Sequence, residues 1–395
     1  MGFVGGGMGR RDATAPVERS GRGARSNAGG RFEKEKRESF DDGWSGHPPS
    51  NYSGAQSGAK PSGVGGAFEP SAAIDLAPAT VVQDERARTI INYVASPFVN
   101  FDRSINMYRG CEHGCIYCFA RPTHAYYGLS PGVDFETRLF AKPNAAAILD
   151  RELRAPGYRP ATIAIGTNTD PYQPIERSRR LMRSVLEVLA RYRHPVSILT
   201  KSSLIARDVD LIAALARDGA AKAMLSVTTL DPALARAMEP RASGPRKRLE
   251  AVRALADAGV PAGVMAAPMI PGLNDHELDA ILAAAKDAGA AFVGYTVIRL
   301  PLEVAGLFRE WLEDARPERA GRVMRAIREM NGGRDYDPQW SRARTPRSVM
   351  AKLIGRRFEA ACSRLGLATD MPVLSCGAFR PPVEKGGQLS LFGES

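Results

Sequence analysis

The stretch RGCEHGCIYCFARP, residues 109–122, places three of the chain's five cysteines within eight positions, at Cys111, Cys115 and Cys118. Glycines inside the stretch allow tight backbone turns. Three thiolates on one short loop can hold three corners of a 4Fe-4S cube, and the fourth iron then has no protein ligand. Our first interpretation is therefore a metal site whose last position is open to another ligand.

A zinc site is the alternative interpretation of the same stretch. Structural zinc takes four ligands, so His113 or His124 would have to join the three cysteines. His113 lies inside the tight loop, and this position favours a residue beside the metal site over a metal ligand. Closed zinc sites also tend to pair two separate CxxC-like halves. These points favour the cluster over zinc.

Cysteine usage and hydropathy indicate where the chain works. An odd number of cysteines, three of them clustered, is unlike the disulfide framework of a secreted protein. The first residues, MGFVGGGMGRRDATAP, have no apolar core of the signal-peptide type. No apolar run approaches the roughly 20 residues of a membrane span. We expect a cytoplasmic protein with no membrane contact.

Composition divides the 395 residues into four parts. Residues 1–85 are rich in Gly, Ser, Arg and Pro without hydrophobic periodicity, which predicts a disordered tail. Residues 86–302 alternate apolar runs with helical patterns, and residues 303–376 are helical in pattern. Residues 377–395 read as a flexible tail.

The alternation over 86–302 predicts the fold class. We expect a strand near 103–108 and five more at 161–167, 195–201, 221–229, 260–268 and 291–300. The helical stretches are 177–192, 208–218, 245–258 and 274–288, the last with Asn274 as N-cap and Glu277 as its capping-box partner. Strand-helix repetition implies parallel strands with right-handed crossovers. Six repeats are too few for a closed eight-fold barrel, so the sequence predicts an α/β fold with a partial, open (β/α)6 barrel that carries its ligands at the strand ends.

The cysteine stretch also resembles a known family. CEHGCIYC, with Tyr117 just before the third cysteine, resembles the cluster motif of the radical S-adenosylmethionine (SAM) enzymes. The resemblance implies that SAM chelates the open iron and that Tyr117 belongs to the cofactor site. It also implies that an electron from the reduced cluster splits SAM into methionine and a 5′-deoxyadenosyl radical, which takes a hydrogen atom from the substrate.

Further segments extend the resemblance over roughly residues 85–366, to a bacterial subgroup related to spore photoproduct lyase. In order they are RSINMYRGCEHGCIYCFARPTHAYYGLSPGVDFET, IGTNTDPYQPIE, ILTKS, LSVTTLDP, EPR and PMIPGLND. The tail segment GRGARSNAGGRFE also resembles the start of that subgroup.

The resemblance implies residues that bind SAM. Thr169 and Asp170, in GTNTDP after the second strand, match a Ser/Thr-Asp pair that accepts the amino group. Lys201, 31 residues after the acid, matches a lysine that pairs with the carboxylate. Ser226 is a weaker candidate for a methionyl or ribose contact. Taken alone, the acid would be a turn residue before proline and the lysine a solvated strand end, but the cysteine motif in register favours the cofactor interpretation.

The charge distribution favours a polyanionic partner. Residues 1–85 contain 10 Lys and Arg and 11 Asp and Glu, so the formal charge of +11 arises from the rest of the chain. A basic body suggests nucleic acid, and the clamp-like C-terminal tail described below points to DNA. Arg299, at the end of the sixth predicted strand, faces either a substrate phosphate or a nearby acid.

The C-terminal tail suggests a second partner. QLSLF, residues 388–392, offers apolar anchors on a polar tail. It resembles the consensus by which bacterial polymerases and repair proteins bind the DNA sliding clamp, which implies contacts through Gln388, Leu389, Leu391 and Phe392. The alternative is a tail that docks on its own domain.

Three functions remain open. The first is a radical SAM enzyme that acts on DNA through a lyase-like reaction, in lesion repair or base modification. The second is the same chemistry on RNA, a protein or a small molecule, and the third is a non-catalytic zinc or clamp-binding adaptor. The enzyme readings also require an electron donor, which we expect to be a protein.

The lyase reaction itself needs a hydrogen donor that this sequence does not show. Spore photoproduct lyases carry a cysteine after the second strand, where this chain has Thr167, and no cysteine lies between 119 and 361. Cys362 and Cys376 are the remaining thiols, and the former also fits a small core residue. The sequence therefore assigns no catalytic residue.

Overall fold

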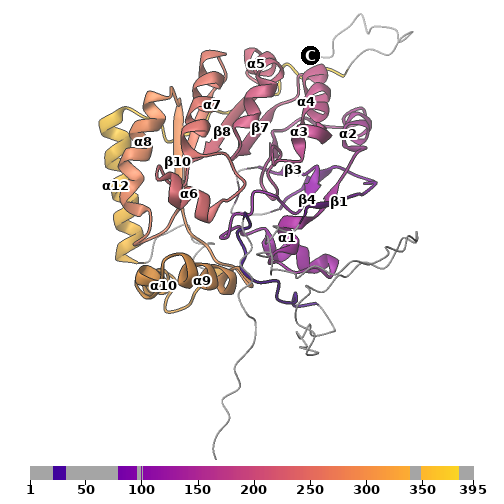
Figure 1. Ribbon diagram of the computed structural model, residues 1–395. Helices are drawn as coiled ribbons and strands as arrows, with labels where there is room; N and C mark the ends of the chain where they lie inside the picture. The colour runs from indigo at the N-terminus through magenta and orange to yellow at the C-terminus, as the bar shows by residue number, and fades with distance from the viewer. Residues whose placement is uncertain (1–20, 33–78, 96–98, 100, 339–347, 382–395) are drawn as a thin grey trace, which may run out of the picture.

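The computed structural model describes residues 21–32, 79–95, 99, 101–338 and 348–381, which form an α/β fold around one central sheet (Figure 1). The sheet has seven strands in the order β10-β9-β8-β7-β6-β3-β2. From β3 to β10 the neighbouring strands pair in parallel, whereas β2 pairs antiparallel with β3. The strands are β2 (Ile91–Tyr93), β3 (Arg103–Ile105), β6 (Ile163–Ile165), β7 (Val196–Thr200), β8 (Ala221–Ser226), β9 (Ala262–Met269) and β10 (Phe292–Val297).

The six parallel strands confirm the predicted partial barrel. Each of them lies within or overlaps one of the six predicted runs. The end strands β10 and β2 do not pair with each other, so the barrel stays open. The strands are rich in Val, Ile and Ala because both faces are covered, and β8 buries five of its six residues.

Helices cover the outer face of the sheet because their apolar residues repeat at helical spacing. In α4 the residues that face the sheet recur every three or four positions, from Leu181 to Tyr192. The crossover helices are α2 (Ala145–Leu153), α3 (Glu176–Arg179), α4 (Leu181–Tyr192), α5 (Val209–Arg217), α6 (Pro232–Met238), α7 (Pro245–Asp257) and α8 (Leu278–Asp287). Short 3-10 turns η1 (Arg121–Tyr127), η2 (Ser203–Asp208) and η3 (Asp275–Glu277) precede some of them.

Two helix predictions need correction. The predicted helix 177–192 is divided into α3 and α4 at Arg180, whose φ of 51° lies in the left-handed region. The predicted capping box at 274–277 is wrong. The side chain of Asn274 accepts from Ile270 N at 2.6 Å, and Glu277 instead accepts from Leu230 N at 2.6 Å, which ties η3 to the loop after β8.

A small second sheet carries the chain into the cysteine stretch. It consists of β1 (Val81–Asp84), β5 (Arg138–Ala141) and β4 (Tyr108–Arg109) in the order β1-β5-β4. The predicted strand 103–108 is therefore divided, since β3 ends at Ile105 and β4 joins another sheet. The cysteines follow directly after β4.

The helical extension is built from α9 (Val304–Ala315), α10 (Pro317–Met330) and α12 (Val349–Leu365). A core that includes Phe308 and Trp311 of α9 also contains Ile116 and Tyr117, so the extension packs directly against the cysteine stretch. In Figure 1 α9 and α10 lie at the lower side of the molecule and α12 lies beside α8. Within the described ranges, none of the helices has the length and apolarity that a membrane span requires.

Residues 367–381, here called the C-terminal strap, cross the sheet at the amino ends of its strands. Ala368 bridges to Phe292 at the start of β10, and Lys222 of β8 donates to Pro372 O at 2.7 Å. Ser375 N donates to the carbonyl of residue 219 at 2.9 Å, before β8 begins. The predicted tail boundary at 377 therefore falls inside a packed segment.

Residues 21–32, here called the N-terminal segment, are also packed, although composition predicts disorder across 1–85. Arg22 is 4% exposed and Ala24 is fully buried. The segment bridges α1 (Asp134–Thr137) and α9, where Ser26 Oγ donates to Glu310 at 2.6 Å and Arg25 pairs with Asp314 at 3.0 Å. In Figure 1 it is the indigo trace at the lower side of the molecule. The prediction of disorder is wrong for these residues because polar contacts hold most of them, and Ala24 alone joins the core that contains Ile116.

His194 is a fully buried side chain just before β7, beside the C-terminal strap. Its Nε2 lies 2.8 Å from the hydroxyl of Tyr158 and its Nδ1 lies 3.0 Å from Pro195 O. The ring of Phe379 from the strap meets it edge-on at 5.5 Å. A neutral ring satisfies both contacts, since one nitrogen donates to the carbonyl and the other accepts from the hydroxyl. Burial lowers the pKa of His194 to about 4.

We expect this histidine to make stability depend on pH. Its pKa in the unfolded chain is about 6.5, so protons bind the unfolded state first as the pH falls. The free energy of unfolding should decrease by about 3 kcal/mol between about pH 6.5 and pH 4. Urea unfolding across this range measures the loss, and His194→Gln should flatten it. An equal pH slope in both proteins would contradict the prediction.

Candidate functional site

The three clustered cysteines lie on the loop 110–118, here called the cysteine loop, at the carboxyl ends of the parallel strands. All five cysteines are free, and Cys111 and Cys115 are buried. Gly110 has a φ of 73°, and a Cβ there would stand 2.9 Å from the carbonyl of Phe135. Glycine is therefore required where the loop turns against α1. Burial raises the pKa of the Cys111 thiol well above its ordinary value.

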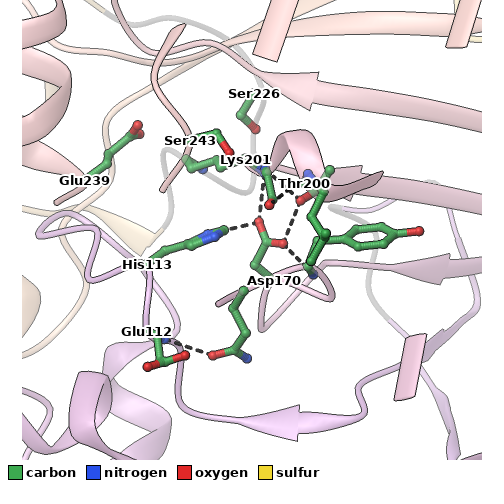
Figure 2. A network of polar contacts seen from close by, with 12 residues as sticks. Glu112, His113, Asp170, Thr200, Lys201, Ser226, Glu239 and Ser243 are labelled. Carbon is green, nitrogen blue, oxygen red and sulfur yellow. Dashed lines mark hydrogen bonds and ion pairs between the residues drawn. The ribbon is translucent and has the colours of Figure 1, made fainter. Parts of the chain in front are cut away.

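Asp170, in the loop after β6, is the centre of the polar network in Figure 2. One carboxylate oxygen accepts from Thr200 Oγ1 at 2.6 Å and from Tyr172 N at 2.9 Å. The other accepts from Lys201 N at 2.8 Å and lies 3.3 Å from His113 Nδ1. Burial alone would raise the pKa of Asp170, but its hydrogen bonds and the facing His113 lower it to about 2.

These contacts change the role that the sequence suggested for Asp170. A carboxylate has about four lone-pair positions, and here four donors of the chain already fill them. The side chain is therefore committed to joining the cysteine loop, through His113, to the end of β7. An amino group that bound Asp170 would have to replace one of these donors, and the direct contact of Asp170 with SAM stays a prediction.

Two residues that follow Asp170 hold the cysteine loop and the strand before it. Gln173, fully buried, accepts from Glu112 N at 2.9 Å and donates to Gly110 O at 3.4 Å. Glu176, also fully buried, begins α3 and accepts from the hydroxyl of Tyr108 in β4 at 2.5 Å. Asp170, Gln173 and Glu176 stand three residues apart, so the segment DPYQPIE holds the cysteine loop through its first two of these residues and β4 through the third.

Arg121 holds the other side of the cysteine loop. The guanidinium is fully buried and donates to the carbonyls of Cys115 at 2.9 Å and Gly114 at 3.1 Å. It also donates to the carbonyls of residues 131–132 at 3.1 and 3.0 Å and to Glu136 at 2.6 Å. Five bonds use all five N–H groups of the side chain.

Glu136, the partner of Arg121, binds the N-terminal segment as well. Its carboxylate accepts from Gly23 N at 2.9 Å and Ala24 N at 2.8 Å. A Cβ at position 23 would stand 1.8 Å from the carbonyl of Gly114, so the segment runs directly against the cysteine loop. One buried carboxylate therefore joins segments more than a hundred residues apart in the chain.

A second buried ionic cluster lies on the barrel side of the cysteine loop. Glu239 accepts from Thr228 Oγ1 at 2.6 Å and also binds the Tyr117 hydroxyl and the Arg248 guanidinium. Burial, reinforced by the facing Glu239 carboxylate, raises the pKa of Tyr117 well above its ordinary value. Tyr117 is thereby fixed as a neutral phenol at the inner wall of the site.

Lys201 points into the space between these groups. Its Nζ lies 5.8 Å from the centre of the Tyr117 ring, and among the described residues no hydrogen-bond acceptor contacts it. Burial would lower the pKa of Lys201, but Cys115 and Glu239 outweigh it and raise that pKa. The lysine is therefore a charged group that lacks a hydrogen-bonded partner.

The other predicted residues lie near this space with different surroundings. Thr169 is buried and donates to Tyr108 O at 3.1 Å. Ser226, at the end of β8, is buried, and its carbonyl accepts from Arg248 at 2.9 Å. Figure 2 shows Ser226 and Lys201 on the same side of Asp170. Arg299 is exposed and stacks on Phe119 at 5.8 Å, so it pairs with a ring and not with an acid.

The histidines considered as zinc ligands and the two thiols outside the cysteine loop lie at defined places in the fold. His113 faces Asp170, and His124 Nε2 lies 2.8 Å from Arg138 O, so both zinc candidates have other partners. Cys362 is buried in the core on α12, and Cys376 lies on the C-terminal strap. Neither remaining thiol lies at the carboxyl ends of the strands.

Several residues of the site escaped the sequence analysis. Arg121, Glu136, Gln173 and Arg248 act through backbone carbonyls or other side chains, and no spacing rule identifies them. The matched segments did offer a signal, because Arg121, Glu136, Gln173 and Glu239 all lie within them without an assigned role. The residues Gln388, Leu389, Leu391 and Phe392 lie outside the described residues. The sliding clamp and the electron donor protein therefore stay predictions.

Comparisons with known proteins agree with this geometry. The family model described as the radical SAM superfamily matches residues 105–285. An uncharacterized protein of Mycobacterium bovis is 42% identical over 230 residues, which are 58% of this chain and 68% of the relative. An uncharacterized protein of Methanocaldococcus jannaschii is 27% identical over 215 residues, 54% of this chain and 76% of the relative.

A solved structure shares the fold. A single-substitution variant of spore photoproduct lyase superposes with a TM-score of 0.52 at 14% sequence identity. The match covers 74% of this chain and 82% of that chain. At this identity the likeness concerns the fold alone.

The pair Arg121–Glu136 generates a prediction about stability. Glu136→Gln removes the charge that compensates a fully buried guanidinium, which should lower the free energy of unfolding by about 3 kcal/mol. It should also release the N-terminal segment, so that trypsin cleaves at Arg22 or Arg25. Denaturant unfolding and limited proteolysis measure the two effects.

The matched control is Glu250→Gln. Glu250 pairs with Arg246 and Lys247 on the surface, where an ion pair contributes little. We expect no measurable change in stability or cleavage. Equal losses in the two variants would show that the buried pair has no special role.

Proposed function

Because the chain belongs to the radical SAM superfamily, we propose that it is an enzyme that repairs a lesion or modifies a base in DNA. The superfamily uses a 4Fe-4S cluster and SAM. One observation carries the proposal. At the carboxyl ends of the strands, three clustered thiols lie near a lysine ammonium that has no acceptor among the described residues. Exposed basic residues lie around this site.

The cysteine loop fits a cluster better than a single ion. Among the described residues, no three His, Cys, Asp or Glu side chains converge closely enough to hold one metal ion. In a cube, by contrast, each thiolate binds a different iron. The donor set of Cys111, Cys115 and Cys118 therefore suits three irons and leaves the fourth to SAM.

The polar space beside the loop fits the amino-acid part of SAM. Lys201 would bind the carboxylate, because its ammonium has no other acceptor within the described structure. The hydroxyls of Thr169 and Ser226 would accept from the amino group. Asp170 would position Lys201 through the backbone bond of 2.8 Å instead of touching SAM.

When bound, the cluster supplies the electron that cleaves SAM to methionine and the 5′-deoxyadenosyl radical. The chain's own part is to hold the reactants and limit access of water. Tyr117, which Glu239 holds in place, forms one side of the site with a neutral ring. His113, held by Asp170, lines the site within the cysteine loop.

Basic side chains at the rim support a polyanionic substrate. Arg177 and Arg180, after β6, are exposed and make no ion pair within the described part of the chain. Arg246 and Lys247 begin α7 after β8 and are also exposed. Such charges bind a nucleic-acid backbone at the same face that holds the thiols.

The proposed reaction differs from one that relies on a thiol of this chain to return hydrogen. All five cysteines are described, and the two outside the cysteine loop lie in the core and on the C-terminal strap. The product hydrogen must therefore come from another group. This supports lesion repair or base modification with a different final step.

The proposal predicts that DNA stimulates the cleavage of SAM. The anaerobically reconstituted protein, given SAM and dithionite, should release 5′-deoxyadenosine faster with ultraviolet-damaged DNA than alone. Cys115→Ala should lose both iron and release. Release that RNA stimulates and DNA does not would contradict the DNA proposal, while no release from a protein with full iron would contradict the enzyme itself.

The role of Lys201 predicts a selective loss of SAM affinity. Lys201→Met should weaken SAM binding roughly 10- to 100-fold, because a charge-assisted hydrogen bond is lost. Its iron and sulfide content should stay that of the wild type. Equilibrium dialysis with labelled SAM measures the affinity, and Lys247→Met at the rim is the control that should bind SAM normally. Unchanged affinity in Lys201→Met would refute the assignment.

A further inference from the structure

Exposed aromatic side chains gather beside the cysteine loop. Phe119, the residue after Cys118, is 51% exposed, and Tyr126 on η1 is 68% exposed. Phe32 at the end of the N-terminal segment is 54% exposed, and Leu302 between β10 and α9 is 61% exposed. Large apolar side chains that are exposed together indicate a binding surface more often than scattered ones do.

Ring contacts gather these side chains into two groups. Arg299 lies over the Phe119 ring at 5.8 Å. At the other end, Arg31 lies over the rings of Phe32 at 5.0 Å and Tyr126 at 5.5 Å. Those two rings are 5.2 Å apart. We call Phe32, Phe119, Tyr126, Arg31, Arg299 and Leu302 the aromatic strip.

The segment 299–303 spans the strip from one end to the other. Its first residue, Arg299, contacts Phe119, and its last, Glu303, pairs with Arg31 at 2.9 Å. Leu302 stands between them with a φ of 53°, a conformation that disfavours a branched side chain. A leucine that is both exposed and held in this conformation is typical of a functional surface.

The chemistry of the strip suits a nucleic-acid strand. Bases stack on aromatic rings and on arginine planes regardless of their sequence, because every base has a π face. Arg299 has no acidic partner among the described residues, so its charge is available to a phosphate. Arg31 is neutralised by Glu303 and serves as a stacking plane. An apolar side chain such as Leu302 can enter between neighbouring bases.

The position of the strip connects it to the site. It starts at Phe119, one residue after Cys118 and directly after the cysteine loop. A base inside a duplex cannot reach a buried site, so the target must leave the helix or already be unpaired. The unpaired bases beside the target then need a surface, and the strip is the aromatic one that adjoins the cysteine loop.

We propose that the aromatic strip binds a single-stranded stretch of DNA and directs its bases to the site. The proposal rests on the proposed action on DNA and adds the surface and the strand form. The N-terminal segment acquires a function in it, since Arg31 and Phe32 form its outer end. Removing residues 21–32 would remove one of the three rings and one of the two arginines of the strip.

Fluorescence anisotropy with the reconstituted full chain tests the strip. The probes are a labelled single strand of about 12 nucleotides and the corresponding duplex. Phe119→Ala and Tyr126→Ala should each weaken single-strand binding about tenfold, because each removes a stacking platform. Phe119→Tyr should retain the affinity. Iron content, measured for each variant, ensures that the cysteine loop is intact.

Tyr93→Ala is the matched control. Tyr93 is also 68% exposed and also carries an arginine, Arg103, at 5.4 Å, but it pairs with the amino end of β3, away from the cysteine loop. Its loss should leave DNA binding unchanged. Salt dependence gives a second readout. The aromatic variants should keep the wild-type slope, whereas Arg299→Ala should reduce it by about one.

The outcomes separate the strip from the proposed function. If the wild type binds DNA but Phe119→Ala and Tyr126→Ala bind it equally well, the proposed role of the strip is overturned and the proposed action on DNA stands. Preference for the duplex over the single strand also overturns the strip. A wild type that binds no DNA at moderate salt overturns both proposals.

Discussion

The buried pair of Arg121 and Glu136 is the constraint on which the rest of the site depends. A buried ion pair normally costs more in lost hydration than its attraction returns, unless further hydrogen bonds satisfy both groups. Here the guanidinium uses all five donors, and the carboxylate also binds Gly23 N and Ala24 N. These bonds hold the cysteine loop, α1 and the N-terminal segment together in one arrangement. The pair therefore determines geometry more than it adds stability.

The sheet could be predicted because its strands and the helices between them each need a local pattern of apolar residues. Buried parallel strands need runs of apolar residues, and the helices between them need apolar residues at helical spacing. The cysteine loop was equally visible because ligand identity and spacing are local. The N-terminal segment was not, since Gly23 and Ala24 bind Glu136 through backbone N–H groups that any sequence possesses. Composition reports the missing apolar core but says nothing of such bonds.

The sequence named residues that the fold brings to the same end of the sheet, but it could not show which contacts their side chains make. An acid before proline at a strand end has the same sequence pattern whether it binds a ligand or holds a loop. In the structure, donors of the chain fill the four acceptor positions of Asp170, whereas the ammonium of Lys201 has no acceptor among the described residues. Such contacts depend on the folded chain, so residue identity alone could not predict them.

The C-terminal strap has a consequence for how large assemblies fit around this protein. Its last described residue follows Arg380, whose N–H binds Tyr192 O at 3.0 Å near the amino end of β7. The cysteine loop lies at the opposite ends of the strands. The C-terminal strap and the cysteine loop therefore lie at opposite ends of the strands, so a macromolecule that contacts the strap would not compete for the surface beside the cysteine loop.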